Sequence, residues 1–515
     1  MKNFFFISII FISMILLGNA QTLTKITEPI EHLQITNFVE SRVVEDNSDE
    51  ITFLTTSITK GRRWQDKKGN NSFITRINRN RNNVLSISAN FIPEKYSIPK
   101  ILNHQSELVL YLSSYETTEE QCVLWKNSYN KTEKSTFKPE RVAACKILRQ
   151  DGYHVYSSQS EDKSKHSILF LIFDNLKSIK KLYAIVMDNE GNILWEKEEN
   201  INLPSQTFRV NGNQVLNDGT IYASIVSQDI NPRGNIIENV YLSILAVNED
   251  KTKIVSEAVT DFTIHNSKMK MLKNRDIVVA GYSSDKDKPE DYKAFQIRFN
   301  TYNESFDSFE LRPLQKVTFS NDKKAGVQLD AEKFNYEIVD IVELENGNPI
   351  MLGEMRAETI SYGEQHTIYV PITATVLFHN LSETDNSTDI YFQKYQAGYG
   401  LSLKRISFSH IVKGNDIYLI FNDNINNFNN PRTDGYVHTQ HFYTPTKMSC
   451  TVLAKVSIDG EISRKIINHA ETNSCFFLKK VHTFENEILL LFQKEAKAMS
   501  VKSDNMIFKL TDFEF

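Results

Sequence analysis

Short apolar runs separated by turn-forming residues recur along the chain after its first twenty residues. Most hold five or six residues, rich in Val, Ile, Leu, Phe and Tyr, and several follow an Asn, Asp or Gly. They are too short for buried helices, and their β-branched and aromatic content is typical of strands. Eight such runs cover residues 50–54, 107–112, 168–173, 221–226, 276–281, 349–353, 416–421 and 487–492. Because no later segment shows a sustained 3.6-residue apolar stripe, we expect an all-β protein with few helices.

A second kind of run has the form strand, Asp/Asn/Gly turn, strand. The clearest copy covers residues 183–195 and residues 452–462 repeat it, whereas residues 241–255 and 295–306 are weaker copies. Asn, Asp and Gly supply the positive φ values that tight hairpins need. The two kinds of run together predict a repeating unit of about four strands.

The first kind of run recurs at intervals of 53 to 73 residues. One four-stranded sheet cannot bury both of its faces alone, but sheets packed around a common axis can. We therefore predict a single β-propeller over residues 21–515, with seven or eight four-stranded blades. Residues 506–515 supply a third strand to the last unit and nothing follows, so residues 23–33 are expected to pair there. Strands from both termini would then close the ring and protect its edges.

Two other architectures also produce short strands. A row of β-sandwich domains should show linkers, and no Pro/Ser/Gly-rich linker is present. A transmembrane barrel is suggested by the alternating, Phe-terminated end of the chain. Its strands should hold roughly ten residues with an apolar outward face, whereas many runs here are shorter and flanked by Lys, Glu and Asp. The propeller fits the pattern better than either.

The first twenty residues have the pattern of a secretory signal peptide. Lys2 is followed by an apolar run over residues 4–17, and Gly18 and Ala20 place small residues before Gln21. The alternative is a membrane anchor, but the run is shorter than the roughly 20 residues that span a bilayer. We expect residues 1–20 to be removed and the mature chain to be periplasmic or secreted, with no membrane span.

Export changes the interpretation of the four cysteines. In an oxidising compartment the two local pairs, Cys122 with Cys145 and Cys450 with Cys475, are the expected disulfides. Only their proximity in the sequence favours this pairing over the other two, and free buried thiols are the alternative. A zinc site would need closely spaced Cys or His ligands, and no Cys-X-X-Cys motif is present.

Composition and charge exclude several classes of protein. The chain has 515 residues, of which 40% are hydrophobic and 24% charged, and its formal net charge is −5. Such a chain can fill a core, so wholesale disorder is excluded. A mildly acidic protein of mixed charge is also not built to wrap nucleic acid or to coat an anionic membrane.

Catalytic and cofactor motifs are missing from the sequence. It contains no HExxH, GxSxG, Walker A or EF-hand pattern, so we expect no cofactor and no resident metal. His438 and His441, with Asp434 upstream, could share an ion only if a turn brings them together, because residues three apart on a strand point to opposite faces. We interpret these histidines as solvated loop residues.

Two groups of polar residues are candidate binding residues. Asn422, Asp423 and Asn424 open an Asn-rich stretch whose amide and carboxylate oxygens could hold a ligand or a cation at the edge of a blade. Glu354 and Arg356 directly follow a predicted strand and could face a central channel. Both groups also have a structural interpretation, as caps of turns for the first and as an ion pair for the second.

The segments 344–354 (LENGNPIMLGE) and 417–424 (IYLIFNDN), within the strand–turn repeat, resemble uncharacterised exported β-propeller-like proteins of gram-negative bacteria. The resemblance rests on pattern over most of the mature chain and implies a propeller fold with no agreed activity. It transfers no functional residue.

The sequence favours a non-catalytic binding or scaffold protein. Propellers bind through loops at one mouth of the ring, where several blades contribute to one concave surface. We expect a protein or glycan partner there, including a role as an accessory of an outer-membrane complex, and a monomer unless a partner holds it. The competing class is a propeller enzyme acting on polysaccharide, a glycoside hydrolase or lyase. A glycoside hydrolase needs two carboxylates roughly 5–9.5 Å apart across a pocket.

Overall fold

A computed structural model provides the structure of the chain. It describes residues 25–26, 38–46, 50–60, 67–78, 84–92, 96–103, 107–130, 137–174, 178–201, 203, 207–230, 236–259, 261–307, 309–314, 335–362, 367–381, 389–397, 407–425, 428, 449–468, 474–476, 482–484, 487–494 and 505–512. Side chains are described chiefly between residues 96 and 467. Within the described residues the elements are strands, and only Ile425 and Phe428 have helical backbone, which agrees with the prediction of few helices.

The strands form eight antiparallel sheets that follow one another along the chain. The first four sheets each hold four strands, paired in sequence order. Their strands are β2 (Phe38–Asp46), β3 (Glu50–Lys60), β4 (Lys67–Asn78) and β5 (Val84–Ile92); β6 (Ser97–Asn103), β7 (Glu107–Glu116), β8 (Gln121–Asn130) and β9 (Glu140–Lys146); β10 (Gly152–Gln159), β11 (Lys165–Phe173), β12 (Ile179–Asp188) and β13 (Ile193–Asn200); and β14 (Thr207–Val215), β15 (Ile221–Ile230), β16 (Ile236–Val247) and β17 (Thr252–Val259).

The other four sheets follow the same plan with two additions. In the fifth sheet β21 and β22 both pair with β20, and in the eighth both β31 and β32 pair with β33. Their strands are β18 (Phe262–Met271), β19 (Ile277–Asp285), β20 (Lys288–Asn300), β21 (Ser305–Phe306) and β22 (Glu310–Pro313); β23 (Asn335–Glu343), β24 (Pro349–Tyr362), β25 (Thr367–Asn380) and β26 (Ile390–Ala397); β27 (Ser409–Lys413), β28 (Asp416–Asn424), β29 (Ser449–Ser457) and β30 (Ile462–Asn468); and β31 (Ser474–Phe476), β32 (His482–Phe484), β33 (Glu487–Lys494), β34 (Asn505–Asp512) and β1 (Lys25–Ile26).

Strand β1 comes from the other end of the chain. Lys25 and Ile26 pair with Leu510 and Lys509 of β34, within the segments that the sequence predicts to meet. β1 thereby becomes the outer neighbour of β34 in the order β1-β34-β33-β31. The two ends of the chain therefore share one sheet.

The eight predicted apolar runs lie in eight corresponding strands. These are β3, β7, β11, β15, β19, β24, β28 and β33, each of which is the central partner between the first and third strands of its sheet. In β19 every residue except Asp285 is buried. The run is continuous rather than alternating because both faces of the sheet are covered by neighbouring sheets.

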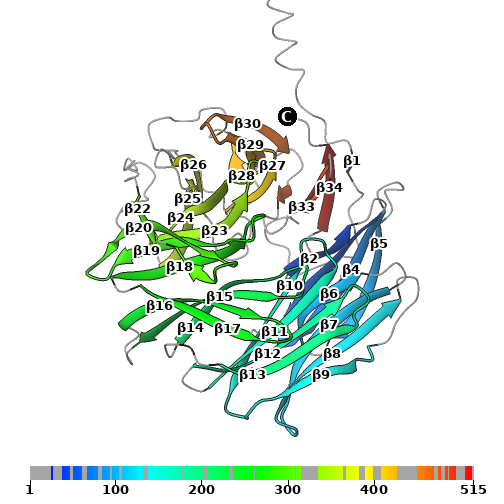
Figure 1. The fold of residues 1–515 in the computed structure, drawn as a ribbon. Coiled ribbons are helices and arrows are strands. Elements are labelled where there is room, and N and C mark those ends of the chain that lie inside the picture. Colours follow the sequence, from blue (N-terminus) through cyan, green and yellow to red (C-terminus); the bar gives the residue numbers. More distant parts are fainter. Residues whose placement is uncertain are drawn as a thin grey trace, which may run out of the picture.

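Hydrophobic clusters fill the spaces between consecutive sheets. One cluster joins sheets β6–β9 and β10–β13, and four more join each later pair up to β23–β26 and β27–β30. The first strands also contact one another in series, β2 with β6, β6 with β10, β10 with β14, β14 with β18 and β18 with β23. Figure 1 shows the sheets following one another in this order. The four sheets from β10–β13 to β23–β26 are thus covered on both faces by their neighbours, which is the packing expected of propeller blades.

The two ends of the sheets differ in their connections. First-to-second connections are short turns, such as residues 344–348, where the amide of Leu344 donates to the carbonyl of Asn348 (3.0 Å) and Gly347 has φ of 84°. Three of the longest connections are residues 314–334, 398–408 and 425–448, which join second to third or fourth to first strands. All three leave the end of the sheets opposite those turns. We call this end the long-connection face.

The expected disulfides are not formed in the structure. Cys122, Cys145 and Cys450 are buried free thiols, and the side chain of Cys475 in β31 lies outside the described residues. Cys122 and Cys145 nevertheless lie directly opposite each other on β8 and β9. The neighbouring Cys145 thiol, together with burial, raises the pKa of Cys122 above its ordinary range. Burial raises the pKa of Cys450 to about 12.

Candidate functional site

The two candidate groups from the sequence meet between sheets β23–β26 and β27–β30. Glu354 and Arg356 lie on β24, and Asn422 and Asp423 lie near the end of β28. Asn424 is the last residue of β28, and its side chain lies outside the described residues. We call the connected side chains the Glu354 network. Its members are Glu337, Glu354, Arg356, Lys394, Gln396, Ser407, Asn422, Asp423, Thr451 and Arg464.

Two glutamates lie opposite each other at the start of this network. Glu337 on β23 and Glu354 on β24 are register partners, which places two like charges directly across a strand pair, a destabilising arrangement by itself. Arg356, two residues further along β24, compensates for it. Its Nε donates to Glu354 Oε2 at 3.0 Å and its Nη1 donates to Glu337 Oε2. One guanidinium therefore bridges both carboxylates.

Exposure changes along this bridge from solvent to interior. The side chain of Glu337 is 47% exposed and that of Arg356 is 39% exposed, whereas Glu354 is fully buried. A buried carboxylate needs compensating charge and hydrogen bonds. The chain of charges thus runs from the surface into the space between the sheets.

Lys394 is the buried partner of Glu354. Its Nζ lies 2.5 Å from Glu354 Oε1 and 2.9 Å from Gln396 Oε1, to which it donates. Its side chain has no exposed surface, and the ammonium lies 5.8 Å from the ring centre of Phe408. Burial lowers the pKa of Lys394, and the negative charge of Glu354 opposes that shift.

Gln396 and Ser407 connect the ion pair to β28. Gln396 Nε2 donates to the carbonyl of Asn422 (2.7 Å), and the amide of Ser407 donates to Gln396 Oε1 (2.7 Å). Ser407 Oγ donates to Glu354 Oε2 (2.8 Å). Ser407 has φ of 93°, a strained conformation for a residue other than glycine. Thr451 Oγ1 donates to Asn422 Oδ1 at 3.3 Å.

Asp423 and Arg464 complete the charge balance. Asp423 is 7% exposed, and its charge acts on both Lys394 and Arg464. The Arg464 guanidinium carbon lies 4.4 Å from the ring centre of Phe392, and burial lowers the pKa of Arg464. Three acidic and three basic side chains are thus gathered in one place with no net charge. Asn422 with Asp423 and Glu354 with Arg356 are two separate candidate groups in the sequence. In the structure they belong to one network.

Sequence reasoning missed six members of the network: Glu337, Lys394, Gln396, Ser407, Thr451 and Arg464. A signal for two of them exists in β26, where Lys394 and Gln396 are two residues apart and so share one face of the strand with Phe392. A lysine on the inward face of an aromatic strand needs a buried acid. Nothing in the sequence around Ser407 marks its role.

A second polar cluster lies on the other side of sheet β23–β26. The Tyr282 hydroxyl of β19 is 3.2 Å from His379 Nε2 of β25, and His379 Nδ1 is 2.9 Å from Asp389 Oδ2. Burial raises the pKa of Tyr282 well above its ordinary value. A Cβ placed on Gly353 would lie 1.7 Å from this hydroxyl, so the backbone of β24 covers it. We call Tyr282, His379 and Asp389 the Tyr282 cluster.

The described part of the chain has neither a metal-ligand cluster nor a membrane-spanning helix. There, no three His, Cys, Asp or Glu side chains lie close enough together to hold a metal ion. His438, His441 and Asp434 lie outside the described residues. The described residues also contain no helix with the length and hydropathy needed to cross a membrane.

Comparisons with known proteins return structures but no sequence family. No family model matches the chain, and no curated protein matches it. The Dos1 propeller is similar over 95% of this chain and 96% of its own, with 8% identity and a TM-score of 0.41. The polysaccharide lyase Uly1 covers 93% of this chain and 100% of its own, with 9% identity and a TM-score of 0.40. The β-propeller domain of the Trilobed protease from Pyrococcus furiosus covers 84% and 96%, with 11% identity and a TM-score of 0.34. At these values the likenesses carry no argument about function.

Proposed function

We propose that the mature chain is a single β-propeller of eight blades whose ring is closed by β1 and β34. Three observations support this. The described strands form eight consecutive antiparallel sheets. The first strands contact one another in series from β2 to β23, and β1 pairs with β34. In this arrangement the first strands line the axis and the long-connection face is one mouth of the ring.

We further propose that the protein binds a protein or glycan partner at the long-connection face and is not an enzyme. The observation that carries this is the internal pairing of the Glu354 network. Its acids and bases compensate one another, so none is left as an unpaired acid or base for proton transfer. What the network offers instead is a fixed arrangement of side chains near the ends of β26 and β28, the strands from which the connections over residues 398–408 and 425–448 leave. We take these connections as the surface that a partner would contact.

The experiment captures partners on the immobilised mature chain and compares the amount bound by two charge-reversal variants. Glu337→Lys changes an exposed acid of the network, whereas Glu249→Lys changes an exposed acid in the β16–β17 turn at the opposite end of the sheets. Envelope extracts and a glycan array are the two sources of partner. Binding that is reduced by Glu337→Lys and retained by Glu249→Lys supports the proposal. Equal loss in both variants, or no saturable binding from either source, contradicts it.

A second candidate function rests on the opposed glutamates. Register partners in an antiparallel pair have Cβ atoms about 4.5–5.5 Å apart, and both carboxylates accept from the Arg356 guanidinium. A pair of neighbouring carboxylates is what a glycoside hydrolase needs, at a separation of roughly 5–9.5 Å. The test is product release from acidic and neutral polysaccharides by the purified chain. Turnover that Glu337→Gln abolishes would favour this enzyme class over the binding protein.

The expected export and disulfides belong to the same proposal. Residues 1–20 would direct the chain to the periplasm or out of the cell. Opposed residues in an antiparallel pair have Cα atoms about 4.5–5.5 Å apart, within the range that a disulfide bridges. Cys122 and Cys145 can therefore be joined without moving β8 and β9. Mass spectrometry of the exported chain under non-reducing conditions tests this bond and the removal of residues 1–20 together.

A further inference from the structure

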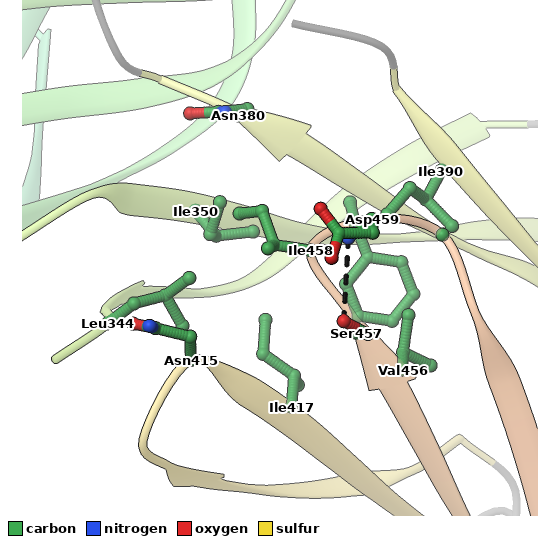
Figure 2. Close-up of a pocket in the computed structure, with 12 residues that line it drawn as sticks. Leu344, Ile350, Asn380, Ile390, Asn415, Ile417, Val456, Ser457, Ile458 and Asp459 are labelled. Carbon is green, nitrogen blue, oxygen red and sulfur yellow. Dashed lines mark hydrogen bonds between the residues drawn. The ribbon is translucent and has the colours of Figure 1, made fainter. Parts of the chain in front are cut away.

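A pocket of about 350 Å³ lies between sheets β23–β26 and β27–β30, at the short-turn end opposite the long-connection face. It is separate from the Glu354 network and shares no residue with it. Figure 2 shows side chains from both sheets and from the β29–β30 turn pointing toward one space. Its apolar wall is formed by Leu344, Ile350, Phe378, Ile417, Val456 and Ile458. This volume is at the lower end of the range for small-molecule sites.

The wall of the pocket is continuous with the hydrophobic core. Leu344 has no exposed surface, Val456 is 2% exposed, and both belong to the cluster that joins the two sheets. The pocket is therefore floored by fixed core side chains, while Ile458 in the turn packs against that cluster from its edge. Such a surface favours an apolar ligand that fits without rearrangement of the sheets.

Among the residues that line the pocket, Asp459 is the one charged side chain, and the other polar groups on the rim are neutral. Asn415 Oδ1 already accepts from the amide of Asn346 (3.0 Å), and Ser457 Oγ accepts from the amide of Asp459. The Asp459 carboxylate, by contrast, has no hydrogen bond or ion pair to any described residue. Glu461, two residues further, is exposed and its charge acts on Lys455, which pairs with Asp416 at 2.7 Å.

We propose that this pocket binds a small ligand with an apolar body and an ammonium group. The ring or alkyl body would occupy the apolar wall, and the ammonium would lie at the Asp459 carboxylate on the rim. The Asp459 carboxylate would repel a ligand that bears a carboxylate. The inference does not depend on the proposed partner binding, because the two surfaces lie at opposite ends of the sheets.

The probe is 2-phenylethylamine, compared with the neutral 2-phenylethanol. Binding is measured by calorimetric titration and by saturation-transfer NMR on the full mature chain. We expect saturable binding of the amine. Since an exposed ion pair contributes at most about 1 kcal/mol, the alcohol should bind about two- to fivefold more weakly. No saturable amine binding, or equal affinity for the two probes, overturns the proposal.

Two pairs of variants locate the binding. Ile458→Trp fills the pocket from a half-buried turn position and should lower amine affinity more than tenfold, whereas Ile462→Trp, at a 42% exposed position on β30, should leave it unchanged. Asp459→Asn should remove the preference for the amine over the alcohol, and Asp250→Asn in the corresponding β16–β17 turn should not. Thermal unfolding is recorded for each variant, and Ile458→Phe replaces Ile458→Trp if that variant unfolds. Wild-type affinity in a folded Ile458 variant contradicts the assignment.

Discussion

The Glu354 network and the Tyr282 cluster lie on the two sides of sheet β23–β26, and both are buried polar groups between sheets. They differ in their connection to solvent. The first runs from the exposed Glu337 and Arg356 to the buried ion pair of Glu354 with Lys394. The second runs from a hydroxyl covered by the backbone of Gly353 through the buried His379 to Asp389, whose side chain is only 13% exposed. A buried polar group with a charged path to the surface can respond to a partner, whereas a covered one can only fix how two sheets pack.

The largest effect is expected from removing one member of the buried ion pair. Lys394→Ala leaves the Glu354 carboxylate buried with less compensating charge, which should lower the free energy of unfolding by about 3–5 kcal/mol. Urea unfolding at neutral pH measures it. The double variant Glu354→Gln, Lys394→Met removes both charges at similar volume and should recover most of the loss. If the double variant is no more stable than Lys394→Ala, charge compensation is not the role of Lys394.

The next largest effect is expected in the Tyr282 cluster. Gly353→Ala places a methyl group 1.7 Å from the Tyr282 hydroxyl and 2.7 Å from its ring carbon, and such overpacking costs about 1–3 kcal/mol. Adding Tyr282→Phe removes the nearer contact, so the double variant should be more stable than Gly353→Ala alone. If the loss of stability in the double variant instead equals the sum of the losses in the two single variants, the β24 backbone does not cover this hydroxyl.

The sequence predicts the central strands of the sheets but not the contacts among the buried polar groups, and the reason is physical. The central strand of each sheet is covered on both faces, so a continuous apolar run such as that of β19 is visible without any knowledge of its neighbours. Glu354 and Asp423 stand out because each is a charge beside such a run. Their meeting is not visible, because Lys394 and Ser407 reach them from other strands or connections.

The Tyr282 cluster leaves even less trace in the sequence. Tyr282 and His379 are 97 residues apart and belong to different sheets, and either residue alone is ordinary in a strand. Only the packing of β19 against β24 and β25 brings them together. Pairing between sheets is a tertiary property, which periodicity along one strand does not contain.

A smaller effect is expected on stability at high pH, which should depend on the Tyr282 cluster. Tyr282→Phe removes one neutral hydrogen bond and should cost about 1 kcal/mol near pH 7. The pKa of Tyr282 is raised above its ordinary 10.0, so above pH 10 the unfolded state loses this proton while the folded state keeps it. Wild-type stability should therefore fall as pH rises above 10, by up to about 1.4 kcal/mol per pH unit from this group.

Urea unfolding between pH 9 and pH 11 measures this slope. The slope should be shallower in Tyr282→Phe, but some should remain because the pKa of Tyr336 is also raised, to about 12, by burial. Tyr302→Phe is the matched control, since Tyr302 is 94% exposed. An identical slope in wild type and Tyr282→Phe would mean that this hydroxyl is not covered.

The smallest effect is expected at Ser407, where the Glu354 network meets the long-connection face. Ser407→Ala removes the hydrogen bond to Glu354 and keeps the side chain at positive φ, whereas Ser407→Gly removes the same bond and relieves the strain. A left-handed conformation costs a residue other than glycine about 1–2 kcal/mol, and glycine loses about 0.5–1 kcal/mol more backbone entropy. The glycine variant should therefore be more stable than the alanine variant by about 0–1.5 kcal/mol, a range centred below 1 kcal/mol. If alanine is the more stable of the two, the backbone at Ser407 carries no strain, and the network then differs from the Tyr282 cluster in its charge and its connection to solvent but not in backbone strain.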